Sequence, residues 1–245
     1  MKLTVIGSGS SGNCYLLDSG TQVLIVEAGC QFKEIKKALN FDITPIAGCI
    51  VSHRHYDHSL SILDLVKSGI KVYTGQETID GLDIGTVRNI IPIKAMQEFM
   101  VGGFKILPFD AIHDVPCLGF LINHPQSGNI LFLTDSCYVK YKFPGLNHLM
   151  VECNYSEEVI ADKYFNGDLH KVLKTRIELN HLSLSTCKDL LLENDLSKVN
   201  NIVLLHLSNS NSSEEKFKKE ITEVTGKNVM IANKGLTMDF NLRAF

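Results

Sequence analysis

The sequence has no Trp, only 6 Pro and no cysteines in a C-x-x-C pattern. Its longest apolar runs, such as QVLIVEAG at 22–29, are far shorter than the roughly 20 residues needed to cross a bilayer. The start, MKLTVIGSGSSGN, carries one Lys and lacks the apolar stretch and cleavage site of a signal peptide. The short apolar runs and the lack of a signal peptide predict a cytoplasmic protein that does not enter a membrane.

The chain also lacks an excess of either charge. Lys and Arg total 24, Asp and Glu total 27, and the formal net charge is −3. A broad basic surface for nucleic acid is therefore excluded, whereas a small anionic substrate held by a metal is not. The 7 cysteines are odd in number and mostly lie within apolar runs, which is typical of small buried side chains in a reducing cytosol.

Short β-branched runs alternate along the chain with stretches of helical periodicity. Strands are expected at 2–7, 46–53, 71–75, 86–91, 148–153, 200–208 and 228–232, and strands or hairpins at 14–29, 98–110 and 117–135. Helices are expected at 32–40, 59–69, 156–165, 168–180, 183–194 and 212–226. Gly69 is expected to end the second helix and Ser185 to cap the fifth. No linker, low-complexity tract or repeat interrupts the pattern, which predicts one α/β domain over 1–245 with sheets packed inside helices.

The segment SHRHYDH at 52–58 places three imidazoles and one carboxylate directly after an expected strand. Imidazole nitrogen and carboxylate oxygen are the ligands that zinc and similar divalent metals prefer. In an extended or turn conformation His53 and His55 point to the same side, while Asp57 and His58 can turn toward a neighbouring point. One short loop therefore offers ligands to two adjacent metals. The alternative is a polar surface loop with clustered histidines, which a total of 9 His in 245 residues disfavours.

The H-x-H-x-D-H pattern is typical of the metallo-β-lactamase fold, and the sequence resembles that superfamily over most of its length. The resemblance implies a four-layer αββα sandwich with further ligands at the ends of later strands. It implies that one metal is held by His53, His55 and His113, that the other is held by Asp57, His58 and His206, and that Asp135 bridges them. The three downstream residues also have structural alternatives. His113 could be a surface loop residue, Asp135 a turn residue after a strand, and His206 a buried core histidine.

Two more segments resemble particular branches of the superfamily. NHLS at 180–183 is similar to the extra histidine of nuclease-type branches such as ribonuclease Z. This similarity implies that His181 faces the scissile phosphate and stabilises charge or protonates the leaving oxygen, with a surface histidine as the alternative. GSGSSGN at 7–13, together with PIAGCIVSHRHYDH, IHDVPCLGFLI and VECNY, resembles the YycJ/WalJ subgroup, which is associated with phosphodiester hydrolysis on DNA. Taken alone, the glycine-rich loop indicates only backbone N–H groups that could bind an anion.

The resemblance implies a metal-dependent hydrolase of phosphodiester bonds, a nuclease for which DNA is the favoured substrate. Two divalent ions, Zn²⁺ or Mn²⁺, would lower the pKa of a bridging water to about 7 and neutralise charge developing on phosphorus. The expected catalytic residues are His181 and Asp57, the latter also a ligand. A cyclic-nucleotide phosphodiesterase or another small-substrate hydrolase of this fold is the alternative, followed by a non-catalytic or redox metal protein. The metal, the substrate and the oligomeric state, including a homodimer, stay open.

Overall fold

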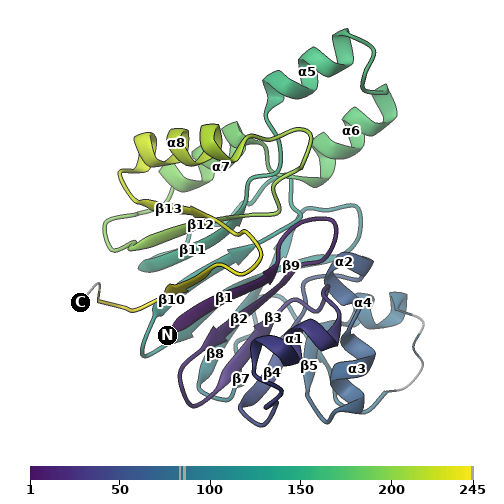
Figure 1. Cartoon of the computed structure of the whole chain (residues 1–245), viewed down its shortest axis with the longest axis vertical. Helices are drawn as coiled ribbons and strands as arrows, with labels where there is room; N and C mark the ends of the chain where they lie inside the picture. Colours follow the sequence, from purple (N-terminus) through teal and green to yellow (C-terminus); the bar gives the residue numbers. More distant parts are fainter. Residues whose placement is uncertain (83, 85–86, 244–245) are drawn as a thin grey trace.

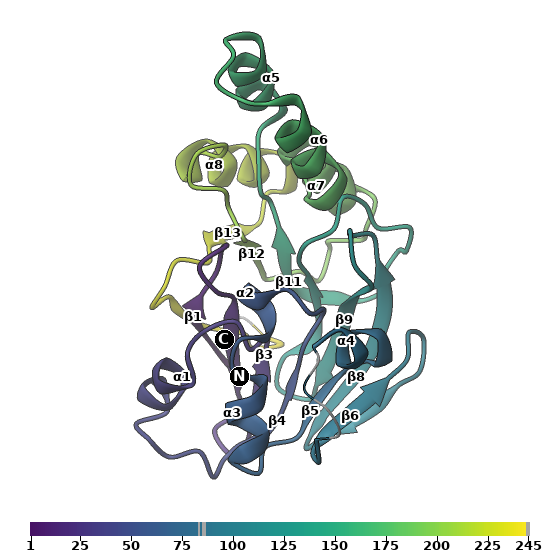
Figure 2. The same cartoon turned by 90° about the vertical axis from the view of Figure 1, so that its right-hand side faces the viewer.

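The computed structural model describes residues 1–82, 84 and 87–243, and within them two sheets of seven strands face each other (Figures 1 and 2). The first sheet has the spatial order β14 (Thr237–Asp239), β1 (Lys2–Gly7), β2 (Cys14–Asp18), β3 (Val23–Val26), β4 (Ile46–Ile50), β5 (Val72–Gly75), β6 (Ile90–Ile93). The second has the order β13 (Asn228–Ile231), β12 (Asn201–Leu205), β11 (Leu146–Glu152), β10 (Gly128–Leu133), β9 (Cys117–His124), β8 (Phe104–Ala111), β7 (Phe99–Val101). The C-terminal strand β14 thus completes the sheet that the N-terminal strands form.

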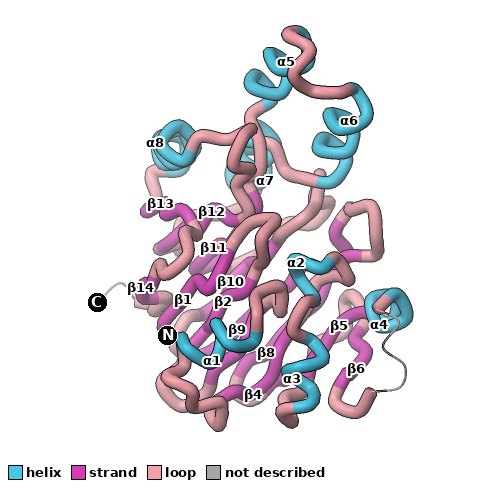
Figure 3. The backbone as a smooth tube through the Cα atoms, turned by 45° about the vertical axis from the view of Figure 1, so that its right-hand side comes forward, coloured by secondary structure: helices cyan, strands magenta, loops and turns pink. Residues whose placement is uncertain are grey.

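Helices lie on the outer faces of both sheets, with α1 and α3 on one side and α7 and α8 on the other (Figure 3). In chain order the helices are α1 (Phe32–Ala38), α2 (Tyr56–Ser59), α3 (Ile62–Lys67), α4 (Gln76–Gly81), α5 (Glu157–Phe165), α6 (Lys171–Asn180), α7 (Leu184–Leu192) and α8 (Glu214–Thr225). Helices α5 and α6 project beyond the body of the molecule, at the top of Figures 1 and 2. No helix in the described ranges combines the length and apolarity that crossing a membrane requires.

Alternate residues of the central strands pack into different cores, because successive side chains of a strand point to opposite faces. In β10, Ile130 and Phe132 join the core between the sheets, whereas Leu131 and Leu133 pack with residues of α7 and α8. Strand β3 is divided in the same way between the core joining the sheets and the cluster beneath α1 and α3. The layers are therefore helix, sheet, sheet and helix, and the expected αββα sandwich is confirmed.

Several expected elements have different ends. The strand expected at 86–91 is β6, and Thr86 lies outside the described residues. The helix expected at 59–69 is shortened to α3, whereas residues 56–59 of the histidine motif form the separate helix α2. Gly69 follows α3 with a left-handed φ of 83°. The prediction that Ser185 caps α7 is wrong. Ser183 caps this helix, because its Oγ accepts a hydrogen bond from the N–H of Thr186 at 3.0 Å, three residues on.

The ends of several strands meet at one edge of the sandwich. Strands β10, β11 and β12 are parallel neighbours, and β8 runs the same way because it is antiparallel to β9, which is antiparallel to β10. Their carboxyl ends therefore lead to the same edge, where His113, Asp135, Glu152 and His206 follow or end these strands. The motif at 52–58 follows β4 of the other sheet. The predicted ligands thus lie where the two sheets adjoin.

Candidate metal centre

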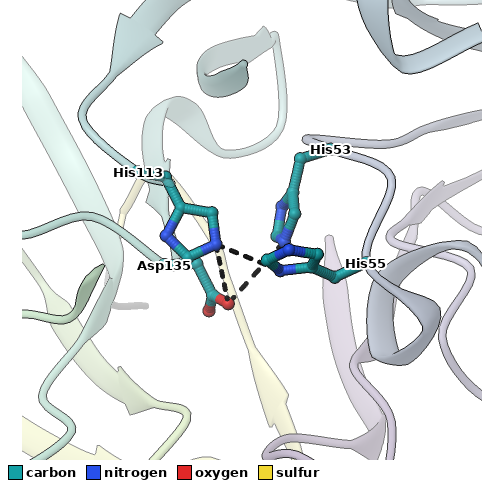
Figure 4. Close-up of side chains that lie close together, drawn as sticks. All are labelled: His53, His55, His113 and Asp135. Carbon is teal, nitrogen blue, oxygen red and sulfur yellow. Dashed lines mark hydrogen bonds and ion pairs between the residues drawn. The ribbon is translucent and has the colours of Figure 1, made fainter. Parts of the chain in front are cut away.

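The seven predicted ligand side chains come together in two overlapping groups. One group consists of His53, His55, His113 and Asp135, whose nearest donor atoms all lie within 4.8 Å of one another (Figure 4). The other consists of Asp57, His58, Asp135 and His206, with the same limit on separation. Asp135 belongs to both groups, which is the arrangement required of a bridging carboxylate. Metal binding by these residues stays a prediction, but the structure brings every one of them to the expected group.

Backbone conformation helps to aim two of these side chains. Asp135 and His206 have φ values of 46° and 52°, in the left-handed region that residues other than glycine adopt infrequently. Each follows the end of its strand, so the chain turns sharply where the side chain must point toward the other sheet. Such conformations cost on the order of 1 kcal/mol or more and persist where surrounding contacts enforce them, commonly at functional sites.

The outward ring nitrogens of the histidines have protein partners. His53 Nδ1 lies 2.8 Å from Ser52 Oγ, and His113 Nδ1 lies 3.2 Å from the backbone oxygen of Asn180. These contacts leave the Nε2 atoms to face the group. The Nε2 of His53 is buried and has no hydrogen-bond partner among the described residues. A buried nitrogen without a partner is unfavourable unless something else, such as a cation, meets its lone pair.

Three carboxylates lie against the outer nitrogens of the remaining histidines. The distances are 3.3 Å from Asp114 Oδ1 to His55 Nε2, 3.3 Å from Glu27 Oε2 to His58 Nδ1 and 3.3 Å from Glu152 Oε1 to His206 Nδ1. The same Asp114 oxygen also lies 3.2 Å from Nε2 of His113. A carboxylate on the outer nitrogen fixes the ring orientation and makes the inner nitrogen a better metal ligand. The residues present therefore fit two divalent cations bound by nitrogen and oxygen donors.

Burial and charge oppose each other within the cluster. Burial by itself would raise the pKa of Asp135, but the imidazoles of His206 and His58 hold it well below its ordinary value. Burial would lower the pKa of His58, but Asp135 and Glu27 raise it well above its ordinary value. Asp135 is therefore held in its ionised form and attracts positive charge, whether from an imidazolium or from a metal ion.

His181 lies beside both groups and is held by a buried carboxylate. It directly follows α6, and its Nδ1 lies 2.7 Å from Oε1 of Glu152, the last residue of β11. The other Glu152 oxygen accepts from the backbone N–H groups of Leu182 and Ser136. Burial by itself would lower the pKa of His181 and raise that of Glu152. The contact between them reverses both effects, so the pKa of His181 is raised and that of Glu152 is lowered.

Sequence analysis did not single out Glu27, Glu152 or Asp114. A usable signal was present for two of them, because Glu27 follows the apolar run of β3 and Glu152 ends the fully buried strand β11. A charged residue at such a position is buried at considerable cost unless it has a partner. Asp114, directly after His113, carries no comparable signal.

Known proteins resemble this chain over nearly its whole length. Residues 15–179 match the family described as beta-lactamase superfamily domain. The exodeoxyribonuclease WalJ of Streptococcus pneumoniae is 26% identical, covering 98% of this chain and 93% of its own length. The exodeoxyribonuclease YycJ of Bacillus anthracis is 23% identical, covering 91% and 89%. The crystal structure of YhfI from Bacillus subtilis, a metallo-β-lactamase fold protein, matches with a TM-score of 0.71 at 21% identity, covering 97% of this chain and 99% of that one.

Proposed function

Because this chain belongs to the β-lactamase superfamily, we propose that it is a two-metal-dependent phosphodiesterase, a nuclease that acts on DNA. The observation that carries the proposal is the pair of donor groups that share Asp135, with His181 held beside them. The relatives WalJ and YycJ are both named exodeoxyribonucleases, which supports DNA as the substrate.

Each of the two donor groups would hold one of the two proposed metal ions. His53, His55 and His113 would hold the first ion, Asp57, His58 and His206 the second, and Asp135 both. When bound, two divalent cations supply Lewis-acid stabilisation of the phosphate charge and a water whose pKa is lowered to about 7. Imidazole and carboxylate donors suit Zn²⁺ or Mn²⁺.

Glu152 and His181 supply the proton chemistry in this proposal. His181 donates its Nδ1–H to Glu152, so the opposite nitrogen, Nε2, is directed away from that carboxylate. The Glu152 carboxylate raises the pKa of His181, which shifts the ring toward its protonated form. A protonated imidazole can donate a hydrogen bond to a phosphate oxygen and a proton to the leaving oxygen. Glu152 is a positioning residue, because it acts through the orientation and charge of His181.

A panel of substrates tests the proposal. Protein purified without chelator is assayed on bis-p-nitrophenyl phosphate, linear DNA, RNA and cyclic mononucleotides, each with Zn²⁺ and with Mn²⁺. We expect cleavage of linear DNA and of bis-p-nitrophenyl phosphate, both abolished by a chelator and restored by added metal. Cleavage of cyclic mononucleotides without cleavage of DNA would instead identify the small-substrate phosphodiesterase. Metal-loaded protein that cleaves none of the four would refute a phosphodiesterase.

A further inference from the structure

The geometry points to Asn13 as a positioning residue that braces Asp57, one of the predicted ligands of the second metal. Asn13 ends the glycine-rich loop at 7–13, which has no part in the function proposed above. The inference rests on that function only insofar as Asp57 binds a metal ion.

The loop folds around the side chain of Asn13. Asn13 Oδ1 accepts from the N–H of Gly9 at 2.8 Å, and Nδ2 donates to the oxygen of Gly9 at 3.1 Å. The N–H of Gly12 donates to the same Gly9 oxygen, and the N–H of Asn13 donates to the oxygen of Asp57 at 2.8 Å. The N–H groups of Gly9, Gly12 and Asn13 are therefore bonded within the protein.

Glycine is required here for close backbone approach. Gly9 and Gly12 have φ values of 142° and 138°, which side-chain-bearing residues rarely adopt. A Cβ on Gly12 would lie 2.5 Å from the oxygen of Gly29, and a Cβ on Gly29 would lie 1.6 Å from the oxygen of Asp57. The loop, the segment after β3 and the metal-binding motif are therefore in direct backbone contact. This contact brings Asn13 to the motif.

The amide nitrogen of Asn13 faces the second donor group. Nδ2 lies 3.3 Å from the backbone oxygen of Asp57, 3.4 Å from its Oδ2 and 3.0 Å from Nε2 of His58. The last of these is the metal-facing nitrogen of His58, whose lone pair a bound cation would take, so the brace acts on Asp57. The N–H of Gly9 and the hydroxyl of Tyr15 both donate to Oδ1, which fixes the orientation of the amide. Asn13 is fully buried, so each of these bonds matters to a group that water cannot reach.

A neutral donor suits this position. A carboxylate oxygen can accept more than one hydrogen bond, so Asp57 can accept from Asn13 and still bind a cation. Lys or Arg at the same place would bring a positive charge against the metal ion. The amide thus orients Asp57 without competing for the charge that the carboxylate offers.

Asn13→Ala tests the brace through metal affinity. We expect binding at the second site to weaken by about 10- to 100-fold, the range for loss of an outer hydrogen-bond partner, while the first site is unchanged. Stepwise chelator competition with Zn²⁺ on metal-free protein measures both sites, and His206→Ala identifies the second. Ser10→Ala is the matched control, since Ser10 is an exposed residue of the same loop. Wild-type affinity at both sites in Asn13→Ala would overturn the inference.

Asn13→Asp keeps the inference testable if the alanine variant fails to fold. It keeps the size and the acceptor for Gly9 but puts an oxygen in place of Nδ2, against the carboxylate of Asp57. A cation would relieve the resulting repulsion, so Zn²⁺ should raise the unfolding midpoint of this variant by more than that of the wild type. An equal or smaller rise would contradict the brace. A wild-type protein that binds no metal would refute the proposed function instead, so the two failures are distinguishable.

Discussion

Replacing His181 by Ala should slow cleavage while leaving the metals in place. The ring is held from outside the two ligand groups, by Glu152 at 2.7 Å, and its raised pKa favours the charged form. Loss of a positioned charged donor typically lowers turnover by about 10²- to 10³-fold, or roughly 3–4 kcal/mol. The loss should be largest for DNA, whose alkoxide leaving group needs a proton. It should shrink for bis-p-nitrophenyl phosphate, whose nitrophenolate leaves as a stable anion.

The assay compares kcat/KM on both substrates with the metal content of the same preparations. His170→Ala is the control, because His170 is exposed at the opposite end of α6. His206→Ala should lose one metal and cleave both substrates poorly. If His181→Ala also loses a metal, His181 is a ligand, as its proximity to Asp135, Glu152 and His206 would allow. If it loses neither metal nor activity, the nuclease-type role of His181 is refuted.

Asp135→Ala should remove both metals together, since both donor groups share this carboxylate; elemental analysis that finds full metal content and activity would contradict the bridge. Glu152→Gln should lower the pKa of His181, which the carboxylate raises. Activity that needs the protonated ring is lost as pH rises through that pKa, so the alkaline limb of the pH–kcat/KM profile should move to lower pH; an unmoved limb would argue against the pair. Asp114→Ala should weaken the first metal by about 10- to 100-fold in chelator competition, because His55 loses its acceptor. Asp114→Asn can still accept that bond and should keep most of the affinity, and equal losses in both variants would show that the bond is not the cause.

The strands and the donor cluster at 52–58 could be predicted because their signals are local, whereas the αββα layers and the ligands His113, Asp135 and His206 were implied by the family resemblance. Strand β10 is a continuous apolar run, typical of a strand buried on both faces, and the motif at 52–58 contains four donors in one stretch. The outer partners could not be predicted in this way, because Glu27 gains its role only where it meets His58 and Asn13 only where it meets Asp57. These pairs depend on how distant segments pack.

The wrong prediction of the residue that caps α7 has a different cause. Two serines lie near the start of α7, at 183 and 185, and composition favours both as caps. The choice depends on which hydroxyl can reach the N–H three residues later, and the turn after α6 gives that position to Ser183. A preference for residue type cannot separate two candidates so close together.

The division of the predicted ligands between the two sheets has a consequence for folding kinetics. The histidines at 53–58 follow β4 of the first sheet, whereas Asp135 and His206 follow β10 and β12 of the second. Neither donor group is complete until both halves of the chain have formed and packed, after the loop between them has closed. A cation that binds only the finished arrangement stabilises the native state without helping its transition state. Bound metal should therefore prolong the lifetime of the folded protein and leave its rate of folding nearly unchanged.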